Sequence, residues 1–326
     1  MKRQAQTSPS GFRAALLLTV TALFAGLPGR AVVIENVGVW QVSWMQTTDS
    51  TSYSKNFTAA EQTAIKNSLL TWDNLIGDTP VRQVQLQLGW SALGAGVLGQ
   101  SSNPLLGNYT TAYTFTELTW REAYSFSPSS YGYNSDAAIT FGTGISWYTG
   151  SGSPGGGEID LASVALHEIG HTLGFTSSYN NATDKWSNVG ITTWDSYLRD
   201  VNGNQPLANS TGTPGNFAAI NSTNPVTFVG VNATAVNSGI NPGVFTSTGT
   251  GYMGGSSLVH VNYPSDPMYY ATYYGAVNRT PSALDLAILK DLGWTIVPEP
   301  AMAMLLLVSG TLLLRSRQRR PPETGH

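Results

Sequence analysis

Hydrophobic residues recur along this chain at two spacings, one typical of strands and one typical of helices. The segment 32–44 is rich in Val, Ile and Trp and predicts an opening strand. Thr58 and Glu61 form a capping box in front of apolar residues at helical spacing, which predicts a helix. Further strands are expected over 81–88 and 136–141. This mixture of elements predicts an α+β fold.

The segment 166–175, LHEIGHTLGF, predicts a second helix that carries chemistry. Asp160 is a suitable N-cap for it, and Gly174 suits the left-handed residue that ends many helices. His167 and His171 stand four residues apart. On a helix their imidazoles therefore lie on one face, one turn apart, and can converge on a single cation.

The chain changes character after this helix. Asn, Thr, Gly and Pro dominate residues 176–255, which predicts largely irregular structure. Within this stretch Asp200, Asn202 and Asn204 surround an Asn-Gly pair, which favours a hairpin turn over a calcium loop. A last helix is predicted over 282–292, with a glycine immediately after its end.

The composition indicates a folded protein with a weakly charged surface. Hydrophobic residues make up 41% and aromatic residues 10% of the 326, enough for one large or two small domains. Charged residues make up only 11%, against roughly 25% in typical soluble domains, as in many exported proteins. The absence of cysteine excludes disulfides, and a net charge of −3 gives no reason to expect nucleic-acid binding.

Both ends of the chain carry targeting patterns. Residues 1–31 contain basic residues, an apolar run and small residues at a cleavage position, which predicts a secretory signal peptide rather than an uncleaved anchor. Residues 298–326 contain Pro-Glu-Pro, a short apolar run over 301–314 and an arginine cluster. This end resembles the PEP-CTERM sorting signal, which implies removal by an exosortase-type enzyme; a plain membrane anchor is the alternative. The folded part, 32–297, would be exported to the cell envelope or beyond.

The histidine pair predicts a metal site. Zinc, Zn2+, is the expected ion, because it accepts neutral imidazole nitrogen and in hydrolytic sites binds three protein ligands and one water. Glu168 stands beside the first histidine and can take a proton from that water. The chain has no cysteine and no glutamate between Glu168 and Glu299, and His326 ends the basic tail. His260 therefore remains the best third ligand, with Asp195 as the oxygen-donor alternative.

These residues resemble a known family. HEIGHTLG, from His167 to Gly174, resembles the start of the metzincin zinc-protease signature, H-E-x-x-H-x-x-G-x-x-H or -D. The match departs at Ser177, which is a poor zinc ligand. The leishmanolysin-like branch of the metzincins has an insertion before its third histidine, and the resemblance implies that His260 takes that place.

The resemblance also implies roles for later residues and for the fold. Met268 would belong to the turn beneath the metal, and Tyr270 would contact the metal or stabilise the transition state; for Tyr270, packing in a tyrosine-rich run is the alternative. The expected fold is a twisted mixed sheet with the active-site helix above it and an irregular C-terminal subdomain that ends in a helix. One sheet edge near the cleft would pair with an extended peptide.

The sequence thus predicts an exported zinc metalloendopeptidase whose catalytic domain spans 32–297 and whose general base is Glu168. Its partners would be protein or peptide substrates, a signal peptidase and an exosortase-type sorting enzyme, with transient membrane anchoring through the C-terminal segment. The alternative is a non-catalytic, zinc-containing envelope or biofilm-matrix protein with a role in adhesion. Glu168 argues against this alternative, because a structural zinc site needs no general base.

Overall fold

The computed structural model describes residues 32–77, 83–102, 135–180, 185–186, 192–205, 225–246, 253 and 255–297. The chain divides into two units, Met1–Ala31 and Val32–His326, and every described residue belongs to the second. The expected signal peptide, 1–31, and sorting signal, 298–326, lie outside the described residues. Within the described part, no helix has the length and apolar character that crossing a membrane requires.

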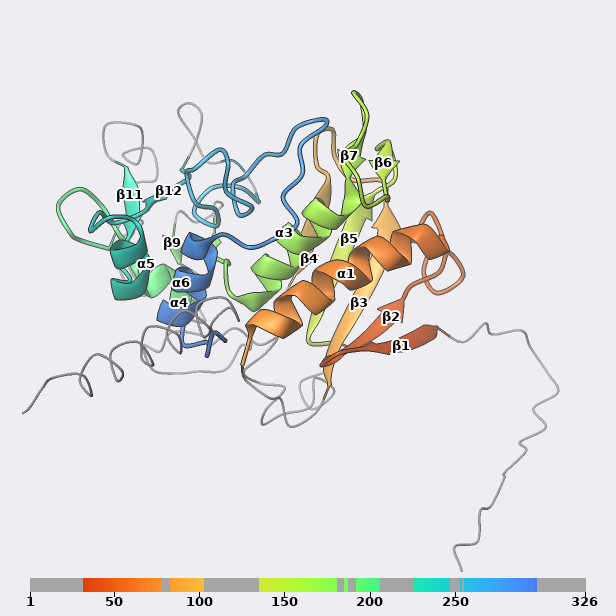
Figure 1. The fold of residues 1–326 in the computed structure, drawn as a ribbon, viewed down its shortest axis with the longest axis horizontal. Helices are drawn as coiled ribbons and strands as arrows, with labels where there is room; N and C mark the ends of the chain where they lie inside the picture. Colours follow the sequence, from red (N-terminus) through yellow and green to blue (C-terminus); the bar gives the residue numbers. More distant parts are fainter. Residues whose placement is uncertain are drawn as a thin grey trace, which may run out of the picture. The chain divides into compact units, whose positions relative to one another are not determined.

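A five-stranded mixed sheet forms one layer of the fold, in the order β1-β2-β3-β5-β4 (Figure 1). The three central strands β2, β3 and β5 are parallel to one another. At the two ends of the sheet, β1 pairs antiparallel with β2 and β4 pairs antiparallel with β5. Their bounds are Val33–Val37 (β1), Trp40–Trp44 (β2), Val84–Ser91 (β3), Gly99–Ser102 (β4) and Ala137–Gly142 (β5). The mixed sheet and the accompanying helices confirm the predicted α+β class.

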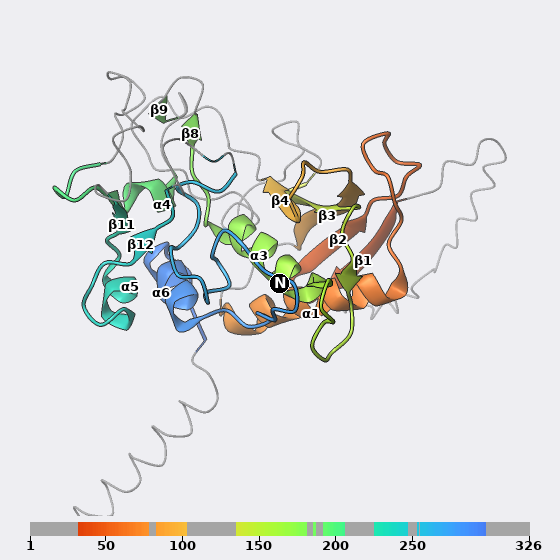
Figure 2. The same ribbon diagram turned by 90° about the horizontal axis from the view of Figure 1, so that it is seen from above.

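Two long helices, α1 (Ala59–Leu75) and α3 (Leu161–Leu173), pack against each other beside this sheet (Figures 1 and 2). Thr58 and Glu61 cap α1 reciprocally, as the sequence predicts. Two side chains of α1 reach backbone carbonyls of α3: Ser68 Oγ donates to Ala162 O at 2.7 Å, and Trp72 Nε1 donates to Leu166 O at 3.0 Å. These bonds fix the height of α3 relative to α1.

Alternate residues of the central strands form the core on one face of the sheet. All are at most 1% exposed, whereas most of their neighbours in sequence are half-buried. They are Trp40, Val42 and Trp44 of β2, Val84, Leu86, Leu88 and Trp90 of β3, and Ala137, Ile139 and Phe141 of β5. Burial of each large side chain contributes roughly 1.5–3 kcal/mol, so this face stabilises a fold that has no disulfides.

The structure corrects the prediction of a single strand over 32–44. Gly38 has a φ of +56° and turns the chain back, so that Val37 pairs with Trp40 in a β1–β2 hairpin. Glycine is required here for two reasons, since the left-handed conformation disfavours a side chain and a Cβ would also collide with the carboxylate of Asp73. The prediction failed because Val39 continues the apolar pattern across the turn.

The remaining elements are short. They are β6 (Trp147–Tyr148), β7 (Ile159–Asp160), β8 (Tyr179–Asn180), β9 (Lys185–Trp186), α4 (Thr193–Ser196), β10 (Leu198–Arg199), β11 (Val226–Phe228), α5 (Val231–Val236), β12 (Gly243–Val244) and α6 (Ala283–Asp291). The strands β10, β11 and β12 form a small antiparallel sheet. Gly293 follows the end of α6 with a φ of +102°, as the sequence predicts, whereas Ser282, expected as the first helical residue, is the N-cap.

Candidate metal centre

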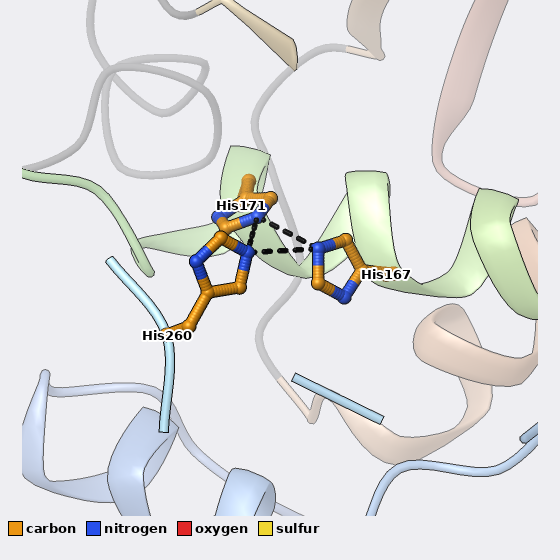
Figure 3. A group of neighbouring side chains, drawn as sticks. All are labelled: His167, His171 and His260. Carbon is orange, nitrogen blue, oxygen red and sulfur yellow. Dashed lines mark hydrogen bonds between the residues drawn. The ribbon is translucent and has the colours of Figure 1, made fainter. Parts of the chain in front are cut away.

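Three histidines from two separate segments meet at one point (Figure 3). His167 and His171 lie on consecutive turns of α3, and His260 lies in the irregular segment before α6. Their Nε2 atoms are 3.0 Å apart for His167 and His171, and 3.1 Å apart for each pair that includes His260. These three residues could hold a metal ion.

The other nitrogen of each ring fixes its tautomer. Nδ1 of His167 lies 2.7 Å from Pro267 O, Nδ1 of His171 lies 2.6 Å from Phe175 O, and Nδ1 of His260 lies 2.7 Å from Ser256 O. Each carbonyl can only accept, so each Nδ1 must carry a proton and donate it. In the neutral imidazoles, all three Nε2 lone pairs then face one another.

Burial keeps these imidazoles neutral. It lowers the pKa of His171 to about 3, with a further lowering by His167 that outweighs the hydrogen bond to Phe175 O. It also lowers the pKa of His260, which the two neighbouring histidines depress further, and that of His167, where the Pro267 carbonyl opposes the effect. Three neutral acceptors in contact repel one another unless a cation lies between them.

The spacing of the nitrogens fits a small divalent cation. Three nitrogens bonded at 2.0–2.1 Å to one tetrahedral ion are about 3.3 Å apart. The observed separations of 3.0–3.1 Å are within a few tenths of an ångström of this value. Backbone carbonyls behind ligating imidazoles are the usual outer partners of such sites, because they orient the ring and raise the basicity of the ligating nitrogen.

A strained backbone presents His260 to the site. Leu258, two residues earlier, has a φ of +67° and a fully buried side chain. Its carbonyl accepts a hydrogen bond of 2.6 Å from Trp194 Nε1, and its N–H donates to Phe245 O at 2.9 Å. A non-glycine residue in this conformation persists only where its surroundings fix it, and here they direct the chain so that His260 enters the site.

Ser177, which stands where the metzincin signature has its third ligand, lies outside the histidine cluster. The chain after Gly174 is held instead by Asp195, whose Oδ2 accepts from Ser178 N and Ser178 Oγ at 2.8 Å and from Thr192 N at 3.0 Å. Ser177 Oγ accepts from Tyr179 N at 3.2 Å. The structure thus brings His260, the first candidate, to the histidine pair and uses Asp195 to anchor the segment that contains Ser177.

Met268 lies directly against α3. Its side chain is fully buried, and a Cβ built on Gly170 would lie 2.5 Å from Met268 Sδ and 3.1 Å from Met268 Cε. Gly170 stands between the two helical histidines, so its missing side chain lets the sulfur pack under them. Pro267, the preceding residue, supplies the carbonyl that holds His167.

The contacts of Tyr270 are aromatic. Its ring stacks on Phe245 with centroids 3.8 Å apart and meets Tyr269 edge-on at 4.6 Å. Tyr269 also shares a hydrogen bond with Tyr270, which, after burial, contributes to raising the pKa of Tyr269 to about 12. These contacts agree with the packing alternative for Tyr270, and its catalytic role stays a prediction.

Glu168 follows His167 on α3 and is buried, at 5% exposure. Burial raises the pKa of its carboxyl to about 8, and a hydrogen bond from the Ser101 side chain opposes this rise. The backbone of β4 approaches the carboxyl so closely that a Cβ on Gly99 would lie 2.6 Å from Glu168 Oε1. A cation held by the histidines would favour the ionised carboxylate.

A buried pair of carboxyl groups supports the turn that carries Met268. Asp266 Oδ1 accepts from Met268 N at 2.8 Å and Asp266 Oδ2 accepts from Ser282 Oγ at 2.7 Å, while Asp285 Oδ2 accepts from Ser282 N at 2.8 Å. Burial, then the charge of Asp266 and a hydrogen bond to it, raise the pKa of Asp285 well above its ordinary value. Asp285 therefore holds its proton to higher pH than an ordinary aspartate does.

Sequence reasoning missed the residues that hold this site in place. Ser101 and Gly99 are more than 60 positions from Glu168, and no local pattern marks Leu258. Ser282 and Asp285 have the spacing of a capping box, but this pattern does not show the contact with Asp266. Gly170 carried a weak signal, because a glycine in the middle of a helix costs about 1 kcal/mol relative to alanine and usually has a packing reason.

Comparisons with known proteins add little to this geometry. No protein-family model matches the chain. A stretch of 81 residues is 37% identical to an uncharacterized protein of the yeast Schizosaccharomyces pombe, strain 972. The stretch covers 23% of this chain and 14% of the yeast protein, so the chain spans only a small part of that relative's length.

We expect His260→Ala to lower the affinity for zinc by more than about 100-fold, because loss of an outer partner alone costs 10- to 100-fold. Asp195→Asn keeps the shape of a residue outside the cluster and serves as the matched control. Bound zinc is measured by elemental analysis and by competition with a chelator. Release of zinc from Asp195→Asn together with retention by His260→Ala would show that the ligand set is wrong.

We expect Gly170→Ala to destabilise the protein by about 1–3 kcal/mol, because the new methyl group collides with Met268 and this outweighs the roughly 1 kcal/mol gain in helix propensity. In a Met268→Ala background the same change should be neutral or stabilising, since the sulfur is gone. Urea unfolding of the four proteins measures the coupling. An equal cost in both backgrounds would refute the contact.

We expect Asp285→Asn to raise the melting temperature by a few degrees at pH values well above the ordinary carboxyl pKa and to have a smaller effect near pH 4. The folded protein holds the proton of Asp285 more tightly than the unfolded chain does, so stability falls as pH rises from the ordinary carboxyl pKa toward the raised folded pKa. An amide that mimics the protonated acid removes this loss.

Thermal unfolding between pH 4 and pH 9 measures this effect, with Asp266→Asn as the contrasting variant. Both oxygens of Asp266 accept hydrogen bonds, so an amide there places a donor against a donor and should lower stability throughout. A pH profile of Asp285→Asn that runs parallel to that of the parent protein would contradict the raised pKa of Asp285.

Proposed function

We propose that this chain is a zinc-dependent metalloendopeptidase of the metzincin type. One observation carries the proposal: three neutral imidazoles turn their Nε2 atoms toward one point, and the residue after the first of them on the helix is a buried glutamate. A metal site needs the first feature, and a hydrolytic site needs both.

The donor set supports zinc as the ion. Zinc accepts imidazole nitrogen readily, and catalytic zinc sites combine three protein ligands with one open position, whereas structural sites are closed by four protein ligands. Among the described residues the cluster of possible ligands consists of His167, His171 and His260. The three-histidine set therefore favours a catalytic site over a structural one.

Three further features support the metzincin assignment. The helix that carries both histidines ends at Gly174, where the signature has its glycine. Met268 packs beneath this helix, where the Met-turn of that family would lie. A helix, α6, follows the methionine. The displaced position of His260 agrees with the leishmanolysin-like arrangement.

The chain's own residues supply proton transfer and orientation. Glu168 would accept a proton from the attacking water and deliver it to the amine of the leaving peptide. The carbonyls of Pro267, Phe175 and Ser256 keep the imidazole rings in their ligating tautomer throughout. When bound, zinc supplies Lewis acidity, which polarises a peptide carbonyl and lowers the pKa of water.

The strand β4 is the proposed place of substrate binding. It ends the five-stranded sheet of the described residues and lies beside α3. An extended peptide that adds to such a strand gains main-chain hydrogen bonds regardless of its sequence, which suits an endopeptidase acting on unfolded protein.

Export of the enzyme is a further part of the proposal. The patterns over 1–31 and 298–326 support secretion by a signal peptide and sorting by an exosortase-type enzyme, with transient anchoring in the membrane. A weakly charged surface agrees with an envelope or extracellular location.

The experiment that tests the function is the pair Glu168→Gln and Glu168→Ala, assayed with casein. We expect both variants to lose at least about 100-fold in kcat, the range over which general acid–base catalysis contributes, and to keep one bound zinc. Histidine ligands are unchanged in both, so zinc content is the internal control. Full activity in either variant would refute the mechanism.

The non-catalytic alternative gives a different outcome in the same assay. A zinc-containing adhesion protein would bind zinc stoichiometrically while the unmodified chain cleaved neither casein nor a peptide library. That result would reject the peptidase and leave the metal site in place.

A further inference from the structure

Two residues of β4, Gly99 and Ser101, lie on the face of this strand that is turned toward Glu168. Gly99 and Ser101 are two positions apart and therefore point to the same face of the sheet. They pair with Phe141 and Ile139 of β5, both of which are buried on the face that packs against the helices. The neighbours of Gly99 and Ser101 within β4 are exposed. Gly99 and Ser101 thus form the part of β4 that lies against α3.

We propose that β4 positions the carboxylate of Glu168, with Ser101 as the hydrogen-bond donor that orients it and Gly99 as the gap that admits it. This inference rests on the proposed function, because it assigns positioning residues to that function's general base. It goes further by naming a second element of the fold, distant in sequence, on which proton transfer depends.

Ser101 meets a need that burial creates. A carboxylate removed from water must find donors within the protein, and a hydrogen bond to a charged group is worth about 1.5–3 kcal/mol. The side chain of Ser101 provides such a bond to Glu168. Since the bond comes from a strand rather than from α3 itself, it fixes the direction of the carboxylate relative to the sheet edge.

Gly99 is required for space and not for backbone conformation. Its φ lies outside the left-handed range, so alanine could adopt the same backbone. A Cβ would nevertheless lie 2.6 Å from Glu168 Oε1, 2.8 Å from Cγ and 2.9 Å from Cδ, closer than real atoms approach. An alanine must therefore displace either the carboxylate or the strand.

The hydroxyl is tested with two variants of one shape, Ser101→Thr and Ser101→Val. We expect Ser101→Val to lower kcat on casein by about 10- to 100-fold, the equivalent of one hydrogen bond to a charged group, with KM and bound zinc little changed. Ser101→Thr restores the donor and should recover most of kcat. Equal kcat values for the two variants would overturn the role of Ser101.

The role of Gly99 is tested by a double-mutant cycle in which the melting temperature, and not the activity, is measured. We expect Gly99→Ala to lower the melting temperature in the parent protein and to be nearly neutral in Glu168→Ala, where the colliding side chain is absent. Gly94→Ala is the matched control, since a Cβ there meets only Val97 at 3.8 Å. An equal effect of Gly99→Ala in both backgrounds would overturn the role of Gly99.

The two tests separate this inference from the proposed function. If the unmodified protein cleaves nothing, the peptidase fails, yet the stability cycle still decides whether Gly99 makes room for Glu168. If Glu168→Gln abolishes cleavage while Ser101→Val and Gly99→Ala leave kcat and the cycle unchanged, the peptidase stands and the positioning by β4 is wrong.

Discussion

The hydrogen bonds behind the three imidazoles are the constraint on which the rest of the site depends. Each Nδ1–H donates to a backbone carbonyl, and this leaves three neutral Nε2 acceptors 3.0–3.1 Å apart. Such an arrangement is unfavourable without a cation. The carbonyls belong to Phe175, Ser256 and Pro267, which follow α3 or lie on either side of His260. The fold must therefore hold these three carbonyl groups, which belong to irregular backbone, in precise positions.

Buried tryptophans provide much of that precision. Trp72 Nε1 donates to Leu166 O in α3, Trp294 Nε1 donates to Leu173 O at the end of α3, and Trp194 Nε1 donates to Leu258 O near His260. Each indole combines a large buried ring with one polar atom. In this chain without disulfides, the tryptophans thus fill the core and also hold, through hydrogen bonds, the segments that carry the histidines.

The sequence predicts the part of this structure that depends on local spacing. The HEIGH segment placed His167, Glu168 and His171 on a helix, and caps set the ends of α1, α3 and α6 within one or two residues. Elimination among few histidines then selected His260, which the structure brings to the other two. This step succeeded because the chain is poor in histidine and lacks cysteine, not because the sequence encodes the distance.

The unpredicted part depends on contacts between distant segments. The β1–β2 turn was hidden because Val39 continues the apolar pattern, and one of the two reasons for glycine at position 38, the approach of Asp73 from α1, is a contact between distant segments. Ser101 and Gly99 look like ordinary polar strand and loop residues until β4 is placed beside α3. The same holds for Asp285, whose raised pKa follows from its burial and from the neighbouring Asp266, neither of which a sequence shows.

Metal binding and the order of the segment that carries His260 are coupled in this arrangement. His260 contributes its ring only while Leu258 remains in the left-handed conformation and the Ser256 carbonyl stays behind the imidazole. The left-handed conformation of Leu258 has a cost in free energy, and a cation offsets it, since binding to a site absent from the unfolded chain stabilises the folded one. Glu168 follows the same logic, because a cation beside it favours its ionised form. Burial thus destabilises the imidazoles and the Glu168 carboxylate in the absence of a cation, and the same burial strengthens their interaction with a cation when one is bound.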